Sequence, residues 1–190
     1  MLIVISGPSG SGKGTIIKEI LNKNKNLVYS VSYTTRPKRK GEIDGKDYFF
    51  IDKKEFEKLI EKGFFIEWAK VYNFFYGTSK DFVIENLKKG KDVILEIEIQ
   101  GARKIREIFD KKDTIFIFIA PPNFEELKRR ILERKRGESK EEIEKRLNFA
   151  IEELEESKNY DYVVINDSID KAVNEILDII EKERRIRYGI

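Results

Sequence analysis

The sequence predicts an α/β protein with a five-stranded parallel sheet and helices on both of its faces. Short apolar runs alternate along the chain with segments of helical periodicity. Five of these runs have the length of buried strands: 2–6, 27–33, 92–99, 114–120 and 162–165. Because parallel strands need crossover connections, the helices between these runs are expected to cover both faces of the sheet.

Helical spacing of apolar residues follows the strand runs. After the first run the spaced residues are Ile16, Ile17, Ile20 and Leu21. Further helices are expected at 101–109, about 123–135, 140–157 and 168–185. The last of these has a single apolar stripe, formed by Ile169, Val173, Ile176 and Ile180.

Residues 34–90 interrupt this alternation. A polar loop leads into a short strand, then into a helix that begins at Asp52 with Glu55 in the capping-box position. The aromatic run 63–72 is strand-like, and YGTSKD (76–81) is expected to open another helix. We therefore predict one domain, residues 1–190, whose core (1–33 and 91–190) contains an inserted mixed α/β segment at 34–90. The charged stretch at about 133–142 is predicted to form a short lid.

Composition excludes several classes of chemistry. The 190 residues include 38 Lys and Arg against 35 Asp and Glu, so no global basic field favours nucleic acid. The absence of Cys and His excludes disulfides, thiolate catalysis and a histidine base. No apolar run reaches the ~18 residues of a membrane span, and no signal segment is evident, so a cytoplasmic protein without a membrane partner is expected.

The stretch GPSGSGK (7–13) has the pattern of a phosphate-binding loop. It follows a strand and opens a helix, which makes a simple glycine-rich turn with a chance lysine improbable. The glycines let backbone N–H groups point inward, and Lys13 supplies a mobile cation. The predicted loop comprises Gly7, Pro8, Ser9, Gly10, Ser11, Gly12, Lys13, Gly14 and Thr15.

Gly14 stands where such loops usually carry a Ser or Thr that contacts Mg²⁺. Magnesium readily keeps several waters, so phosphate oxygens, water and a carboxylate elsewhere in the chain can complete its shell. Thr15, one position later, can contact the α-phosphate instead.

The inserted segment contains residues suited to a second phosphate and to a base. Arg36, Arg39 and Tyr48 lie close in the sequence, and two guanidiniums with a phenol can grip one phosphate dianion. Glu67 lies within the aromatic run FFIEWA. A buried carboxylate there calls for two adjacent N–H donors, which guanine presents and adenine does not.

These stretches together resemble the guanylate kinase family over essentially the whole chain. The matching segments are GPSGSGKGT, SVSYTTRPKRKGEIDGKDYFF, FFIEWAKVYNFFYGTS, VILEIEIQGARKI, FIFIAPP and RRILERKRGESKEEIEKRLNFAIEEL. The resemblance implies a P-loop kinase core with an inserted nucleotide-monophosphate-binding segment. It also implies transfer of the γ-phosphoryl group of ATP to GMP, and to dGMP, with Mg²⁺, in purine nucleotide metabolism.

The resemblance also implies roles for particular residues. The loop 7–15 would bind ATP. The GMP site would comprise Ser32, Arg36, Arg39, Tyr48, Glu67, Tyr76, Thr78 and Glu98. The catalytic set would be Lys13, Arg39, Arg130, Arg134 and Arg146. No direct protein ligand to the metal is expected, although Glu96 and Glu98 can reach it through water.

Three features of the chain qualify this transfer of roles. Glu96 and Glu98 stand where the family often has Asp, and their i, i+2 spacing is expected to put them on one face of a strand. Arg134 and Arg136 compete for one lid role. Arg130 and Arg134 lie one helical turn apart, whereas Arg129 faces away.

Two other functions remain in view. Some guanylate-kinase-like domains are non-catalytic peptide-binding modules, but those typically lack the phosphate loop. A kinase for another small phosphorylated acceptor is the second alternative, against which Glu67, Thr78 and the arginine pair weigh. A monomer or a homodimer is expected.

Overall fold

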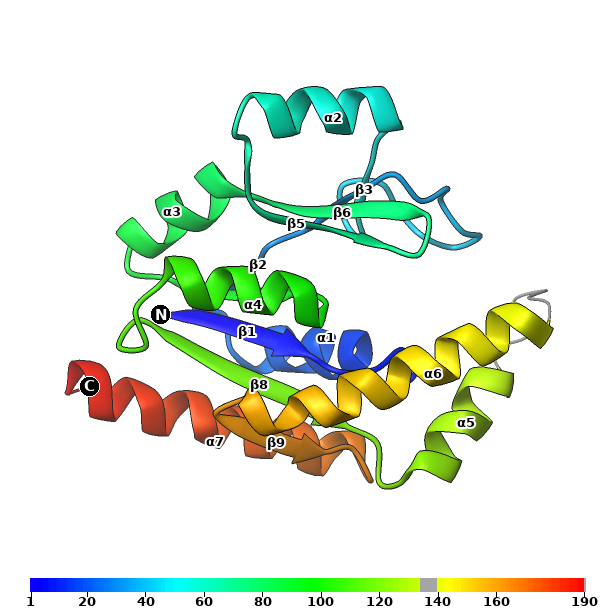
Figure 1. Ribbon diagram of the computed structural model, residues 1–190. Helices are drawn as coiled ribbons and strands as arrows, with labels where there is room; N and C mark the ends of the chain where they lie inside the picture. Colours follow the sequence, from blue (N-terminus) through cyan, green and yellow to red (C-terminus); the bar gives the residue numbers. More distant parts are fainter. Residues whose placement is uncertain (134–139, 190) are drawn as a thin grey trace. The chain divides into compact units, whose positions relative to one another are not determined.

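The computed structural model describes residues 1–133 and 140–189. Its larger sheet has five parallel strands (Figure 1), in agreement with the predicted fold class. In spatial order they are β2 (Leu27–Tyr29), β7 (Asp92–Glu96), β1 (Leu2–Ser6), β8 (Thr114–Ala120) and β9 (Tyr162–Ile165). Every residue of β1 and β8 is buried, as expected for strands covered on both faces. Most of the predicted lid, including Arg134 and Arg136, lies outside the described residues.

The helices that accompany this sheet lie close to their predicted positions. They are α1 (Lys13–Lys23), α4 (Ile99–Ile108), α5 (Phe124–Glu133), α6 (Lys140–Glu156) and α7 (Ile169–Tyr188), with a short 3₁₀ turn, η1 (Ser157–Asn159). In the part of the chain that the structure describes, no helix combines the length and apolar character needed to cross a membrane.

The predicted strand at 92–99 is too long. Strand β7 ends at Glu96, and Glu98 is already the N-cap residue of α4. Glu96 and Glu98 therefore do not share one face of a strand, and that prediction was wrong. The apolar run continues across the boundary because Ile97 and Ile99 are both buried, which hides the change from strand to helix in the sequence.

A second sheet of four short strands has the order β4 (Phe49–Phe50), β3 (Tyr33–Thr34), β6 (Phe74–Ser79) and β5 (Phe65–Val71). It is mixed, because β3 pairs parallel with β4 and antiparallel with β6. The predicted strand 27–33 is thus divided between β2 and β3. The helix expected to open within 76–81 is α3 (Lys80–Lys88), with Ser79 as its N-cap, while the first part of that stretch belongs to β6, which runs to Ser79.

The chain divides into two compact units, and Met1–Val4 with Asn26–Thr114 form the first. Helix α2 (Lys53–Glu61) covers one face of the mixed sheet in Figure 1. Phe56 of this helix stacks on Phe65 and Phe75, with ring centroids 4.5 and 5.4 Å apart. The predicted cap is confirmed, because Asp52 Oδ1 accepts a 2.9 Å hydrogen bond from the Glu55 amide. The domain boundaries proposed at 33/34 and 90/91 stay a prediction.

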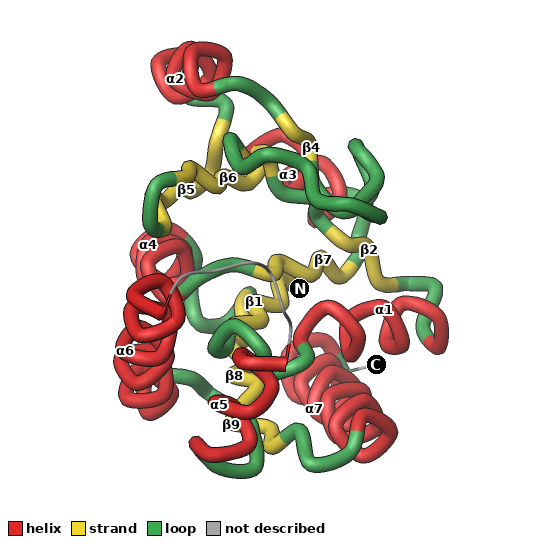
Figure 2. The backbone as a smooth tube through the Cα atoms, turned by 90° about the vertical axis from the view of Figure 1, so that its right-hand side faces the viewer, coloured by secondary structure: helices red, strands yellow, loops and turns green. Residues whose placement is uncertain are grey.

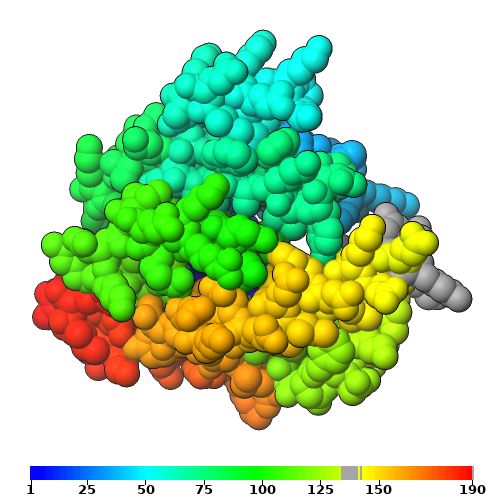
Figure 3. Space-filling view, in the orientation of Figure 1, coloured from blue at the N-terminus to red at the C-terminus, as the bar shows by residue number. Residues whose placement is uncertain are grey.

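The second unit consists of Ile5–Lys25 and Ile115–Ile190. Helices α1 and α7 lie side by side in it, as Figure 2 shows. The α7 stripe is buried at Val173, Ile176 and Ile180, whereas Ile169 is exposed. Leu127 and Ile131 of α5 pack against α6, and Figure 3 shows the opposite side of α6 at the surface.

Candidate functional site

The loop after β1 requires glycine at two of its positions. Gly7 and Gly12 have φ values of 150° and 94°. A Cβ at Gly7 would lie 2.2 Å from the Ile119 carbonyl oxygen, and one at Gly12 would lie 2.4 Å from Nδ2 of Asn166. Both distances are far below van der Waals contact, so the backbone can follow this path only without side chains.

The loop leads directly into the N-terminus of α1. Gly12 is the N-cap and provides no side-chain acceptor, so the first amides of the helix remain available to an anion. The Lys13 ammonium donates to the Gly7 carbonyl and, at 3.2 Å, to that of Pro8. The buried Ser11 hydroxyl has no hydrogen-bond partner among the described residues. These open donors suit a phosphate chain.

Gly14 differs from the other loop glycines because nothing lies within 4 Å of the Cβ that it lacks. It is exposed in the first turn of α1, next to the exposed Thr15. A side chain would therefore fit at Gly14, and its absence has no packing reason.

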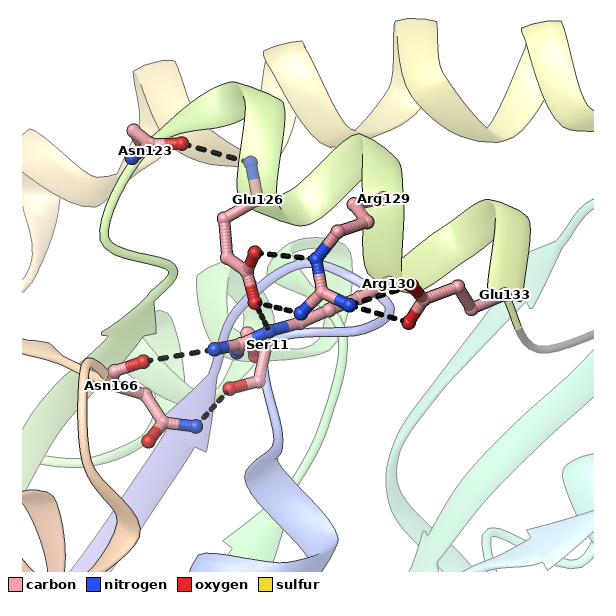
Figure 4. Close-up of polar contacts among 7 residues, drawn as sticks. All are labelled: Ser11, Asn123, Glu126, Arg129, Arg130, Glu133 and Asn166. Carbon is pink, nitrogen blue, oxygen red and sulfur yellow. Dashed lines mark hydrogen bonds and ion pairs between the residues drawn. The ribbon is translucent and has the colours of Figure 1, made fainter.

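Arg130 is held by hydrogen bonds at both ends of its guanidinium (Figure 4). Nε donates to Glu126 at 2.7 Å, and Nη2 donates to the Asn166 carbonyl at 3.3 Å. The Asn166 side chain in turn donates to the Ser11 carbonyl at 2.6 Å. The arginine is thus connected to the phosphate loop through one asparagine.

Arg129 has a different environment from its neighbour. It is 55% exposed and forms ion pairs with Glu126 and Glu133, and it shares the Glu126 carboxylate with Arg130. Hydrogen bonds from Arg129, the larger contribution, and from Arg130 lower the pKa of Glu126 to about 2. Glu126 is therefore a carboxylate throughout the physiological range.

Arg146 of α6 reaches the same loop. Its Nη2 donates to the Ser9 hydroxyl at 2.8 Å, and the side chain is buried. The second unit therefore brings together the loop, Arg130 and Arg146 among the predicted residues. Arg134, the remaining lid arginine, lies outside the described residues.

In the first unit, Arg36 lies in a cage of aromatic and acidic groups. It forms two hydrogen bonds with Glu42, of 2.7 and 3.1 Å, and its guanidinium carbon lies 5.4 Å from the centre of the Tyr48 ring. Tyr48 and Tyr76 make an edge-to-face contact at 5.9 Å. Burial raises the pKa of Tyr48, so its phenol stays protonated and can donate to an anion.

Arg39 is more exposed than Arg36. Its side chain is exposed, and its backbone amide donates to Glu42 Oε2 at 2.7 Å. Glu42 thus joins the two arginines of the predicted phosphate site. The structure brings Arg36, Tyr48 and Tyr76 together, with Arg39 at the edge of this group.

Glu67 is a buried carboxylate, with 5% of its surface exposed. It faces Thr78 across the β5–β6 pair and accepts a 2.5 Å hydrogen bond from the Thr78 hydroxyl. Burial raises the pKa of Glu67 to about 7, although the Thr78 hydroxyl and Lys104 act in the opposite direction. A group of this kind is poised to accept further N–H donors.

The remaining predicted residues lie around these two groups. Ser32 is buried, and its carbonyl accepts from the Phe49 amide at 2.9 Å. Glu96 accepts a 3.3 Å hydrogen bond from the Tyr29 hydroxyl at the end of β7. Glu98 is half-buried at the start of α4 and raises the pKa of Glu67 through its charge.

Two residues of these networks, Glu42 and Asn166, were not among the predicted site residues. Glu42 is the acidic member of an otherwise basic loop, RPKRKGE, and that contrast was a usable signal. Asn166 directly follows β9, and polar residues at the carboxyl ends of parallel strands are common ligand-site positions.

Comparison with known proteins gives a consistent result. The family model described as "Guanylate kinase" matches residues 1–183. The guanylate kinase of Caldanaerobacter subterraneus subsp. tengcongensis is 56% identical over 185 residues, which cover 97% of this chain and 88% of that protein. The enzyme of Clostridioides difficile is 50% identical over 184 residues, with the same coverage of both chains.

A solved structure supports the same conclusion. The crystal structure of guanylate kinase from Anaplasma phagocytophilum matches with a TM-score of 0.80 and 37% identity, covering 96% of this chain and 85% of that one. The family-model match over residues 1–183 includes both the phosphate loop and the segment that carries Arg36 and Glu67. With likeness of this extent in sequence and in fold, the chain belongs to the guanylate kinase family, enzymes that transfer a phosphoryl group from ATP to GMP.

Proposed function

We propose that the two residue groups divide the two substrates of the guanylate kinase reaction between them. The loop 7–15 binds the ATP phosphates through its amides and Lys13, while Arg130 and Arg146 neutralise charge on the transferred group. The geometry that supports this is the link from the loop to each arginine, through Asn166 in one case and Ser9 in the other.

GMP occupies the other group in this proposal. Arg36, Arg39, Tyr48 and Tyr76 bind its phosphate, because guanidiniums and protonated phenols are the donors that a phosphate dianion requires. Ser32, Glu67, Thr78 and Glu98 contact the guanine. The support for the base assignment is the buried Glu67 carboxylate, which has a fixed Thr78 hydroxyl on one oxygen and can still accept donors.

The reaction needs no protein base. An oxygen of the GMP phosphate is already ionised at neutral pH and attacks the γ-phosphorus of ATP, with ADP as the leaving group. The chain's contribution is to position the two anions and to offset their repulsion with Lys13 and the arginines. Mg²⁺, held by ATP phosphate oxygens and water, would supply further positive charge.

The residues present fit such a water-rich metal shell. Gly14 leaves room where a metal-binding hydroxyl usually stands, and among the described residues no cluster of three or more acidic side chains could hold an ion directly. Glu96 and Glu98 would act through water. Acceptance of dGMP, a cytoplasmic location, and a monomeric or homodimeric state belong to the same proposal.

The observation that carries the assignment is the buried Glu67–Thr78 pair. We would measure ADP release with GMP, dGMP, AMP, UMP and CMP for the wild type, Glu67→Gln and Lys13→Ala. Glu67→Gln is expected to reduce the preference for GMP over AMP by at least about tenfold, because the amide replaces one acceptor by a donor. Lys13→Ala is expected to abolish turnover with every acceptor.

An unchanged ratio of GMP to AMP turnover in Glu67→Gln would refute the guanine assignment. Glu57→Gln serves as the matched control, because Glu57 is an exposed residue of α2 whose ion pair with Lys53 lies at the surface. Equal use of UMP or CMP by the wild type would favour a different acceptor class.

A further inference from the structure

Helix α4 packs against strand β5, and Lys104 links the two elements. The Lys104 ammonium donates to the Trp68 carbonyl and lies 4.4 Å from the centre of the Trp68 ring. Lys104 thus makes a cation–π contact and a charge-assisted hydrogen bond with the same residue, and together they hold α4 against β5. The N-terminal turn of α4 is therefore held close to the neighbour of Trp68 in β5, which is Glu67.

Gly101 is the point of closest approach between this helix and the carboxylate. A Cβ at Gly101 would lie 2.5 Å from Oε2 and 3.1 Å from Cδ of Glu67, and 3.4 Å from Cβ of Ile97. Separations of 3.4–4 Å are ordinary van der Waals contact for a Cβ atom, and real Cβ atoms essentially never approach closer than 3.0 Å. With any side chain at position 101, Glu67 cannot keep its place.

The backbone gives no other reason for glycine here. Gly101 lies within α4 and is not one of the residues with positive φ. At such a position alanine favours the helix by about 1 kcal/mol over glycine. Glycine weakens the helix at this position, and the space that it leaves is filled by the Glu67 carboxylate.

The carboxylate is consequently fixed from two sides. Oε1 accepts from the Thr78 hydroxyl at 2.5 Å, and Oε2 lies against the bare backbone of α4 at Gly101. Two donors of a purine can be matched only if both oxygens keep their direction, since hydrogen bonds weaken steeply with misalignment.

We propose that Gly101 is a positioning residue for acceptor specificity, which sets the place of the Glu67 carboxylate by leaving space for it. This inference rests on the proposed guanine-reading function of Glu67. The clash at Gly101 is with the far end of a flexible side chain, so an added methyl group moves the carboxylate and leaves the helix in place. The substitution is thus expected to damage recognition without damaging the fold.

The test compares Gly101→Ala with the wild type by steady-state kinetics and thermal unfolding. The expected result is a rise of at least about tenfold in KM for GMP, with KM for ATP and kcat/KM for AMP unchanged. The melting temperature should stay equal or rise. A purely structural role would instead lower the melting temperature and affect both substrates.

Restoring the space provides a second test. Glu67→Asp withdraws the carboxylate by one methylene, so the losses caused by Gly101→Ala and Glu67→Asp should be less than multiplicative in the double variant. Glu107→Ala is the control on the same helix, because Glu107 is exposed. It should leave KM for GMP unchanged.

The outcomes separate this inference from the function on which it rests. If Glu67→Gln abolishes the preference for GMP while a folded Gly101→Ala retains it, the positioning function of Gly101 is refuted and the guanine assignment stands. If Glu67→Gln has no effect on that preference, the guanine assignment itself fails. Fully multiplicative losses in the double variant would also overturn the inference.

Discussion

The Thr78 hydroxyl donates a 2.5 Å hydrogen bond to a Glu67 carboxylate that is almost fully buried. The two residues face each other across the antiparallel pair of β5 and β6, just after a register irregularity between Phe65 and Glu67. This bond offsets part of the cost of burying an acid. The β-sheet therefore determines which oxygen of Glu67 accepts the hydrogen bond of Thr78.

Replacing Thr78 by Val removes that donor while keeping the shape of the side chain. The pKa of Glu67 is expected to rise further, and KM for GMP to increase by about tenfold, because a charged hydrogen bond is lost. Thr78→Ser retains the hydroxyl and should stay near the wild type. If Val and Ser behave alike in GMP titrations, the bond has no function in acceptor binding.

Burial of Glu67 also makes stability depend on pH. Its pKa is about 7 in the folded protein against an ordinary value of 4.5, so the folded state binds the proton more tightly. This contribution to stability is complete below about pH 4.5 and is lost as pH rises through about 7, by up to about 1.4 kcal/mol per pH unit. Urea unfolding followed by circular dichroism should show this fall in the wild type and a flatter profile in Glu67→Gln. Parallel profiles would contradict the assigned burial cost.

The ion pair between Arg36 and Glu42 gives the opposite sign. Burial alone would raise the pKa of Glu42, but the Arg36 guanidinium and the Arg39 amide hold it below its usual value. Glu42→Gln should therefore lower the free energy of unfolding by about 2 kcal/mol at pH 7, measured by urea denaturation. The difference from the wild type should shrink as pH falls below about 4.5, since Glu42 then becomes protonated as well. Glu57→Gln, which breaks an exposed pair with Lys53, should cost almost nothing.

Glu126 is expected to act on catalysis through Arg130. Glu126→Ala releases Nε of this arginine, so kcat should fall by about tenfold while KM for GMP stays constant. Glu133→Ala is the matched control, because among the described residues of this charged cluster Glu133 pairs with Arg129 and not with Arg130. Equal losses of kcat in the two variants would show that the effect is general to the helix.

Gly14→Ser restores the hydroxyl that phosphate loops usually carry. Nothing lies within 4 Å of the new Cβ, and serine is a better helix residue than glycine, so stability should rise by about 0.5 kcal/mol. The Mg²⁺ concentration that gives half-maximal rate should fall, since the hydroxyl adds a metal contact. An unchanged magnesium titration would mean that the metal lies out of reach of position 14.

The sequence was most informative where one physical pattern had one structural solution. Buried strands such as 114–120, the helix cap at Asp52 and the glycine pattern of the loop were all predictable for this reason. Strand β6 was not, because FFYGTS pairs on its other edge with β3, which lies far from it in the chain, as well as with the neighbouring β5. Glu98 was placed on a strand because an apolar pattern does not mark where a strand ends and a helix begins.

The candidate site was predictable in its residue types and less so in its contacts. A charged residue inside FFIEWA indicated a buried acid, and its burial is confirmed. That Glu42 pairs with Arg36, or that Asn166 lies between Ser11 and Arg130, depends on tertiary placement of loops. Gly101 carried no signal in the sequence, because a glycine inside a helix shows its reason only when its neighbour in space is known.

The Lys104 ammonium lies over the indole of Trp68, and the chain contains a single tryptophan. Tryptophan fluorescence of this protein therefore originates from one ring, adjacent in sequence to Glu67. A cation close to an indole alters its emission, so any displacement of α4 from β5 should change the wavelength or the intensity of the tryptophan emission. The protein thus carries a built-in optical reporter, which needs no dye and no added label.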